Sequence, residues 1–154
     1  MVDNHLYFED LLVGEVYDSP GRTVTEADVV TFCGVSGDFN ELHIDEEFMK
    51  TTQFGTRIAH GLLGLSMQSG LGSHAMRGPV STLAFLGIKE WNFKAPIYIG
   101  DTIRVRFSVS ERRVAKSGDR GVVTWKREVL NQRGEIVQDG YMTTLVRLRE
   151  KGAS

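Results

Sequence analysis

The sequence predicts an α+β fold in which a long antiparallel sheet packs against one largely apolar helix. After Pro79 the chain contains long segments with strand patterning, joined by turns too short for the crossover connections that parallel strands need. Before Pro79, residues 59–76 carry apolar side chains around most of a helix. Because only the apolar face of the sheet can bury such a helix, we expect the two to pack together.

The first helix is expected at residues 25–36. Thr25 is a favourable N-cap residue, and Asp28 stands three residues later, where it is a weak capping-box partner. Gly37 follows the helical segment and can end it in the left-handed conformation. These signals place a helix end immediately before a run of small and polar residues.

Two more helices are expected before the sheet. A short one should begin at Asp45 and carry Phe48 and Met49 inward. The other covers residues 59–76, which at about 1.5 Å per residue would span roughly 27 Å. Each glycine inside it lowers helix stability by about 1 kcal/mol relative to alanine. We therefore expect another backbone to approach the helix closely and offset that loss.

Four strands are expected in the second half of the chain, at residues 83–94, 102–113, 121–131 and 136–149. In the second of these segments apolar and polar residues alternate, which is typical of a strand with one buried and one solvent-facing side. The apolar members are Ile103, Val105, Phe107 and Val109. Because short turns join the strands, we expect a meander in which sequence neighbours pair.

The composition is that of an ordinary globular protein of 154 residues, 25% of them charged and 41% hydrophobic. We expect a single domain over residues 1–154, since no linker-like stretch divides the chain. A formal charge of −2 argues against nucleic acid as a partner. No window resembles a signal peptide or a membrane span, and Cys33 is alone. We therefore expect a cytoplasmic protein without disulfides or membrane contact.

The segment GDFNELH, residues 37–43, contains two groups that can move protons. It places Asp38 five residues before His43, and Gly37 supplies a flexible joint. A carboxylate and an imidazole that share one water can act as base and acid in the addition of water to a conjugated double bond. From spacing alone, an ordinary surface ion pair is the default interpretation.

A second segment, FGTRIAHGLLGLSMQSGL at residues 54–71, favours the catalytic interpretation. Together the two segments resemble the MaoC-like dehydratases, whose members include the R-specific enoyl-CoA hydratases. The similarity extends from GRTVTEADVVTFCGVSGD to GEIVQDGYMTTLVRL, nearly the whole chain. The resemblance implies a hot-dog fold, in which a long antiparallel sheet wraps around a central helix, and a homodimer joined edge to edge.

The resemblance also implies a reaction, the hydration of a trans-2-enoyl thioester to an R-3-hydroxyacyl thioester or the reverse dehydration. The substrate would be an acyl-CoA or an acyl carrier protein thioester. The family's catalytic aspartate and histidine fall on Asp38 and His43, and its amide for the thioester carbonyl falls on Gly61. Its supporting serine falls on Ser69, and the asparagine of its motif is Asn40. No cofactor or metal is expected, because the thioester itself acidifies the alpha carbon.

The roles of these residues can also be explained from physical chemistry, without the family resemblance. The N–H of Gly61 has no partner within a helix that starts there, and the helix dipole adds about half a positive charge. We expect the Asp38 carboxylate to take a proton from water and the imidazolium of His43 to protonate C2. One departure from the family is Glu41, where many members have proline. That departure leaves the rigidity of the loop open.

Several alternatives remain at this point. A metal site is not expected, because no nearby ligand pair has a spacing such as HExxH. The residues concerned are Asp38, His43, Asp45 and His60. We interpret His60 as a packed neighbour of the helix start and Cys33 as a buried filler. Trp91, Phe93 and Trp125 are expected in the packing of the sheet, with an acyl tunnel as the alternative. A hot-dog acyl-CoA thioesterase and a non-catalytic acyl-thioester-binding subunit are the rival functions.

Overall fold

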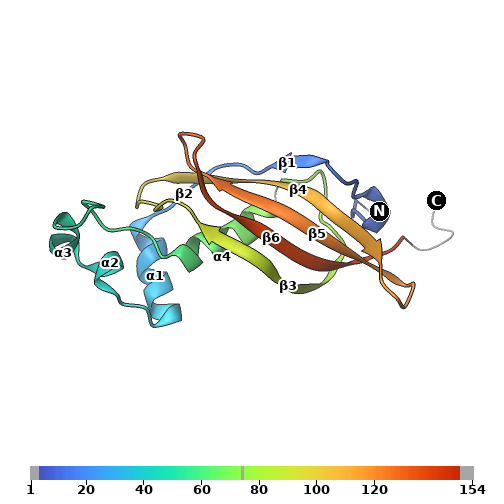
Figure 1. The fold of residues 1–154 in the computed structure, drawn as a ribbon, viewed down its shortest axis with the longest axis horizontal. Coiled ribbons are helices and arrows are strands. Elements are labelled where there is room, and N and C mark those ends of the chain that lie inside the picture. The colour runs from blue at the N-terminus through green and yellow to red at the C-terminus, as the bar shows by residue number, and fades with distance from the viewer. Residues whose placement is uncertain (1–3, 74, 150–154) are drawn as a thin grey trace.

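The computed structural model describes residues 4–73 and 75–149. Its sheet packs on α4, while α1, α2 and α3 gather beyond one end of the sheet (Figure 1). The strands are β1 Val16–Asp18, β2 Arg22–Thr23, β3 Thr82–Phe93, β4 Thr102–Val114, β5 Arg120–Leu130 and β6 Ile136–Arg147. The helices are the 3-10 turn η1 Phe8–Asp10, then α1 Glu26–Ser36, α2 Glu41–Ile44, α3 Glu46–Lys50 and α4 Gly61–Gly72. The α+β fold with a long antiparallel sheet around a central helix is confirmed.

The sheet has the strand order β1-β4-β5-β6-β3, with β2 also paired to β4, and the recorded pairs are antiparallel. The predicted meander is correct for β4, β5 and β6 and wrong for β3, which pairs with β6 instead of β4. Residues 94–101 carry the chain across the end of the sheet between these two strands. Three strand spacings amount to about 14 Å, which a segment of eight residues spans easily. A short connection therefore did not require adjacent strands.

Alternation along β4 decides which side of the sheet is buried. The four predicted core residues of this strand are at most 2% exposed, and the arginines between them are partly exposed. They form one core cluster with residues of α4 and α1. The buried face of the sheet is thus the face that receives α4. The four residues are Ile103, Val105, Phe107 and Val109.

The central helix is shorter than predicted and is buried on one side only. It begins at Gly61 and ends at Gly72, and residue 74 of the predicted range lies outside the described residues. Leu63 is buried, whereas Leu62 is 57% exposed. A helix lying on one face of a sheet buries a stripe of side chains, so the opposite stripe stays open in a single chain. No helix in the described part of the chain is long and apolar enough to cross a bilayer.

The glycines of α4 permit close contacts, although the neighbours are side chains instead of the predicted backbone. A Cβ at Gly64 would lie 2.4 Å from Gln138 Nε2 and 2.7 Å from Ile97. A Cβ at Gly72 would lie 2.4 Å from the guanidinium of Arg127. These contacts let the helix approach β5 and β6 more closely than an alanine would allow.

The predicted signals around the shorter helices are largely confirmed. Thr25 caps α1 and forms the capping box with Asp28, and Gly37 ends the helix at φ 75°. Asp45 caps α3. The prediction that both apolar residues of α3 point inward is correct for Met49, which is fully buried. It is wrong for Phe48, which is 45% exposed because α3 lies at the periphery.

Candidate active site

The segment between α1 and α2 fixes the position of the predicted acid and base. Gly37 ends α1, and the Asp38 N–H then donates to Ser36 Oγ at 3.1 Å. The side-chain oxygen of Asn40 accepts from Leu42 N and starts α2, the one-turn helix that ends with His43 in its last turn. Four residues are too few to show a helical period, so α2 was not predicted. The cap residue Asn40 was its only signal.

Glu41 occupies the first helical position of α2. Proline is favoured at that position because the N–H there has no intrahelical partner. A glutamate at the same position has a favourable interaction with the helix dipole. The difference from the family motif therefore leaves the geometry of this loop intact.

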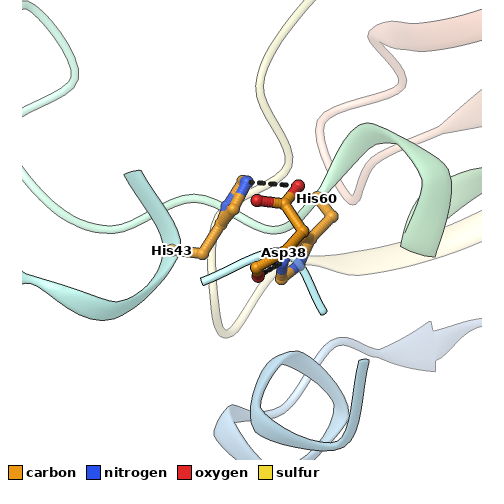
Figure 2. Close-up of side chains that lie close together, drawn as sticks. All are labelled: Asp38, His43 and His60. Atoms are coloured by element: carbon orange, nitrogen blue, oxygen red, sulfur yellow. Dashed lines mark hydrogen bonds and ion pairs between the residues drawn. The ribbon is translucent and has the colours of Figure 1, made fainter. Parts of the chain in front are cut away.

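Asp38 and His43 face one another across a short gap. Asp38 Oδ2 lies 4.0 Å from His43 Nε2, and Figure 2 shows the carboxylate directed at that edge of the ring. The Asp38 side chain is 52% exposed, whereas that of His43 is 9% exposed. A separation of 4.0 Å is too long for a direct hydrogen bond, but it leaves room for one water about 2.8 Å from each atom. The pair is arranged to hold a water molecule.

The other nitrogen of His43 determines which proton the ring carries. Nδ1 lies 2.7 Å from the carbonyl oxygen of Ile58, so Nδ1–H donates there and the neutral ring has its lone pair on Nε2. Burial lowers the pKa of His43 below its ordinary value, and His60 lowers it further. The bond to Ile58 and the charge of Asp38 act in the opposite direction without reversing the shift. A neutral imidazole therefore presents a basic nitrogen to the gap.

His60 takes a larger part in the site than the sequence suggested. Its ring stacks on His43 with centroids 3.6 Å apart and an interplanar angle of 26°. Its Nε2 lies 3.0 Å from the backbone oxygen of Asp38 and 3.6 Å from Cys33 Sγ. His60 thus contacts both members of the pair, as Figure 2 shows. Its place beside Gly61 was the only available signal, and a histidine there is usually a packed neighbour.

A pocket of about 520 Å³ opens beside His43. Its lining is mainly apolar and includes Leu42, Phe54, Ile58, Phe93 and Ile97. We refer to it as the His43 pocket. Mainly apolar walls with a few converging polar groups are typical of small-molecule sites.

Gly61 contributes its backbone to the His43 pocket. As the first residue of α4 it has an N–H without an intrahelical acceptor, at the positive end of the helix dipole. A Cβ at this position would lie 2.8 Å from ring carbons of Phe93, so a side chain would displace the wall of the pocket. Gln138 Nε2 donates to the Gly61 carbonyl at 3.0 Å and holds this end of the helix against β6.

Ser69 is not brought to the acid–base pair within one chain. It lies eight residues beyond Gly61, about 12 Å along the helix axis, and lines a different pocket. Ser66 and Ser73 donate to carbonyls of the same helix, Leu62 O and Gly70 O, as serines in helices commonly do. The structure therefore brings together Asp38, His43 and Gly61, with Asn40 as the cap of the intervening turn.

Asp38, His43 and His60 each offer one possible metal-ligand atom, and these atoms lie within 4.8 Å of one another. The two imidazoles are stacked nearly parallel, however. A ring nitrogen binds an ion in its own ring plane at about 2.0–2.1 Å. With ring centroids 3.6 Å apart and planes tilted by only 26°, the two rings do not converge on an ion at that distance, so this arrangement fits a shared water better than a shared metal.

Known proteins resemble the chain over most of its length. A family model described as "MaoC like domain" matches residues 10–131. The chain is 34% identical over 143 residues to an (R)-specific enoyl-CoA hydratase from Rhodospirillum rubrum, and the match covers 93% of each chain. A solved structure from Archaeoglobus, described as a monoamine oxidase regulatory protein, is 41% identical with a TM-score of 0.89, covering 97% of this chain and 99% of that one. A Mycobacterium tuberculosis protein described as having a double hotdog fold is 21% identical with a TM-score of 0.84, covering 100% of this chain and 48% of that one, which supports the fold alone.

Proposed function

This chain belongs to the MaoC-like domain family and is a hydro-lyase, and we propose that it reversibly hydrates a trans-2-enoyl thioester to an R-3-hydroxyacyl thioester. The single observation that carries the proposal is the 4.0 Å gap between Asp38 and His43 beside an apolar pocket that also contains the Gly61 amide. Acyl-CoA and acyl carrier protein both fit as the thioester. The R configuration comes from the named relative.

Water addition begins with His43 in this proposal. The neutral Nε2 takes a proton from the bridging water while the water oxygen bonds to C3 of the enoyl group. The electron pair of the C2–C3 double bond moves toward the thioester carbonyl and gives an enolate. This order differs from the expectation that the Asp38 carboxylate removes the proton. The lowered pKa of His43 supports the change, because the ring starts without its second proton.

The proton then returns to carbon. The imidazolium of His43 donates the same proton to C2, and the carbonyl bond re-forms, so one water has been added across the double bond. The Asp38 carboxylate orients the water and stabilises the imidazolium across the gap. Because C3 and C2 react with groups on one side of the alkene, the addition is syn. Dehydration follows the same steps in reverse.

The enolate oxygen needs a donor, and we assign this role to the N–H of Gly61. Loss of one such donor in other enzymes lowers the rate about 10²–10³-fold. Substitution of Gly61 is a poor test of the idea, since any Cβ would collide with Phe93. The acid–base pair offers a cleaner one.

The decisive experiment follows the absorbance of crotonyl-CoA with wild type, Asp38→Asn and His43→Gln. These variants keep the side-chain shapes and remove the charge or the basic nitrogen, so each should lose at least about 100-fold in kcat. His5→Gln, outside the His43 pocket, is the matched control and should keep full activity. Full activity in both site variants would remove Asp38 and His43 from the mechanism.

The same assay separates the rival functions. Loss of the enoyl absorbance without release of thiol indicates hydration, and release of thiol indicates a thioesterase. Binding of crotonyl-CoA with neither change would indicate a non-catalytic subunit. The description of the Archaeoglobus relative as a regulatory protein makes this third outcome worth measuring directly.

We also propose that the chain forms a homodimer. β3 pairs on one side with β6 and carries exposed apolar side chains, including Phe85 and Ile88. An unpaired apolar edge of this kind favours association with a second copy. Helix α4 directly precedes β3 along the chain, and its exposed side would belong to the same interface. Across that interface, Ser69 would support the acid–base pair of the other subunit.

The remaining expectations stay part of the proposal. The first is a single domain over residues 1–154, whose first and last few residues lie outside the described ranges. The second is a cytoplasmic setting, supported by Cys33, which is buried and forms no disulfide. No organic cofactor or metal takes part in the proposed steps. The thioester carbonyl itself stabilises the charge that forms at C2.

A further inference from the structure

A second pocket, of about 240 Å³, lies beside the C-terminal half of α4. We refer to it as the Arg127 pocket. Phe107, Trp125 and Met76 give it apolar walls, and hydroxyl groups line it as well. The hydroxyl residues are Ser69, Ser73, Thr82 and Thr144. Among the described residues of its lining, Arg127 on β5 is the one charged side chain.

Arg127 carries a positive charge without an acidic partner. Within residues 4–73 and 75–149, no ion pair is recorded for this guanidinium, and its Nε is buried without a hydrogen-bond partner. Its Nη1 donates to Gln68 Oε1 at 3.0 Å, and its Cζ lies 4.9 Å from the ring centre of Phe107. Burial lowers its pKa to about 10, so the group stays charged at neutral pH.

The surroundings preserve this charge instead of neutralising it. Gln68 is a fully buried residue of α4, and its two oxygens that accept from Nη1, Oε1 at 3.0 Å and the backbone oxygen at 3.5 Å, are both neutral. Gly72 leaves the space for it, since a Cβ there would lie 2.4 Å from Nη1. A buried charge without a counter-charge is strongly unfavourable, and arginine does not lose its proton to avoid that. The pocket leaves the guanidinium open to a bound anion, which would supply the missing counter-charge.

We propose that the Arg127 pocket binds a carboxylate, and that the thioester hydrated by this chain carries a second carboxylate at the far end of its acyl group. The substrate part of this inference rests on the proposed hydration of an enoyl thioester. A guanidinium binds a carboxylate through two parallel hydrogen bonds, and the hydroxyl of Thr144 can donate to the same oxygens. Aromatic walls suit the methylene groups that lead to it.

The size of the pocket favours an acyl tail over the phosphates of coenzyme A. A volume of about 240 Å³ holds a short carbon chain with a carboxylate but not a nucleotide. The two pockets share no lining residue, and Gly61 and Gly72 are about 16 Å apart along α4. Within one chain only a long acyl group spans that distance. In a dimer, a shorter one suffices if the pocket of the second copy faces the acid–base pair.

The test compares two series of trans-2-enoyl-CoA from four to twelve carbons, one ending in a methyl group and one in a carboxylate. Wild type should prefer the carboxylate at some length by about tenfold or more in kcat/KM. Arg127→Met, of similar length and without charge, should lose that preference and still hydrate the methyl series. The exposed Arg113→Met is the matched control and should behave as wild type. Wild type that favours the methyl series at every length would overturn the proposal.

A binding measurement keeps the inference separate from the proposed function. Hexanoate, with hexanamide as the uncharged control, is titrated while tryptophan fluorescence is recorded, because Trp125 lines the pocket. Hexanoate should saturate the wild-type signal and fail to do so with Arg127→Met. That result would support the carboxylate site even if neither enoyl series were hydrated. An equal response of wild type and variant would refute it, whatever the hydration assay shows.

Discussion

The chemical character of His43 comes from the different partners of its two ring nitrogens. Nδ1–H donates a hydrogen bond to the Ile58 carbonyl, so the lone pair of the neutral ring must lie on Nε2, which faces Asp38. Burial then keeps this nitrogen unprotonated by lowering its pKa. A surface pair with the same sequence spacing would have neither the fixed tautomer nor the shift.

The first prediction concerns pH. If neutral His43 is the base, kcat/KM for crotonyl-CoA should be constant above about pH 7 and fall in acid, with a midpoint below the ordinary histidine value of 6.5. Asp38→Asn should move the midpoint of its residual activity lower still, because the Asp38 charge raises the pKa of His43. A wild-type midpoint at or above pH 7 would contradict the assignment.

The same shift affects folding. A histidine with a lowered pKa in the folded state contributes stability above pH 6.5 that is lost as the pH falls through the folded value, since the unfolded chain binds the proton more tightly. The wild type should therefore lose more unfolding free energy between pH 7 and pH 5 than His43→Gln does. Urea unfolding at the two pH values measures the difference.

His60 provides the second prediction. His60→Phe keeps an aromatic ring against His43 and removes the hydrogen bond to the Asp38 backbone. We expect kcat to fall about five- to tenfold through loss of one positioning hydrogen bond, with KM nearly unchanged. The acid midpoint should also rise, because His60 lowers the pKa of His43. A purely structural role would lower stability without moving the midpoint, and His5→Phe is the control.

At the scale of elements, α4 connects the two pockets to the sheet. Its N-terminus supplies Gly61 to the His43 pocket, and its last turns supply Gly72 to the Arg127 pocket. Between them Gly64 lies directly against Gln138, which in turn bonds the Gly61 carbonyl. Glycine thus reduces intrinsic helix stability but permits the close packing that positions the helix N-terminus.

Two glycines of α4 form a matched test of that statement. Gly64→Ala places a methyl group 2.4 Å from Gln138 Nε2 and should destabilise the fold by about 1–3 kcal/mol. Among the described residues, a methyl group at Gly70 meets no atom within 4 Å beyond its own helix, so Gly70→Ala should stabilise the fold by up to about 1 kcal/mol. Urea unfolding at one protein concentration measures both. Equal effects would show that helix propensity, and not the packing against β6, governs these positions.

At the scale of the whole molecule, one chain leaves an apolar surface uncovered. β3 is an edge strand, and Leu83, Phe85, Leu86, Ile88 and Phe93 are between 42% and 57% exposed. Helices α1, α2 and α3 extend beyond the end of the sheet and carry the acid–base pair there (Figure 1). Such a shape would be completed by a second copy that covers β3 and the open side of α4.

The dimer is the fourth prediction. Sedimentation equilibrium should give twice the mass of one chain, and Phe85→Lys should shift the protein toward monomer by placing a charge in the apolar edge. Val114→Lys, at an equally exposed apolar position on β4, is the control and should remain dimeric. A wild type that stays monomeric at high micromolar concentration would rule out this assembly.

Much of the fold could be predicted from the sequence because the signals for it involve residues close together in the chain. The capping box at Thr25, the left-handed Gly37 and the alternation along β4 each depend on residues a few positions apart. The sequence likewise predicted Asp38, His43 and Gly61, since their motif is a short linear pattern. The partner of β3 could not be predicted, because a strand can pair with either exposed edge of the sheet. The path of residues 94–101 across the end of the sheet decides that β3 pairs with β6.

By itself, the sequence determined the class of fold and the family of this hydro-lyase, and it predicted Asp38 and His43 as the reacting groups. Only the tertiary structure decided that His60 stacks on His43, that burial lowers the pKa of His43 and that Arg127 has no acidic partner among the described residues. The physical reason is that protonation and charge pairing depend on which groups lie within a few ångströms. Those neighbours are brought together by the fold from residues as far apart as 68 and 127.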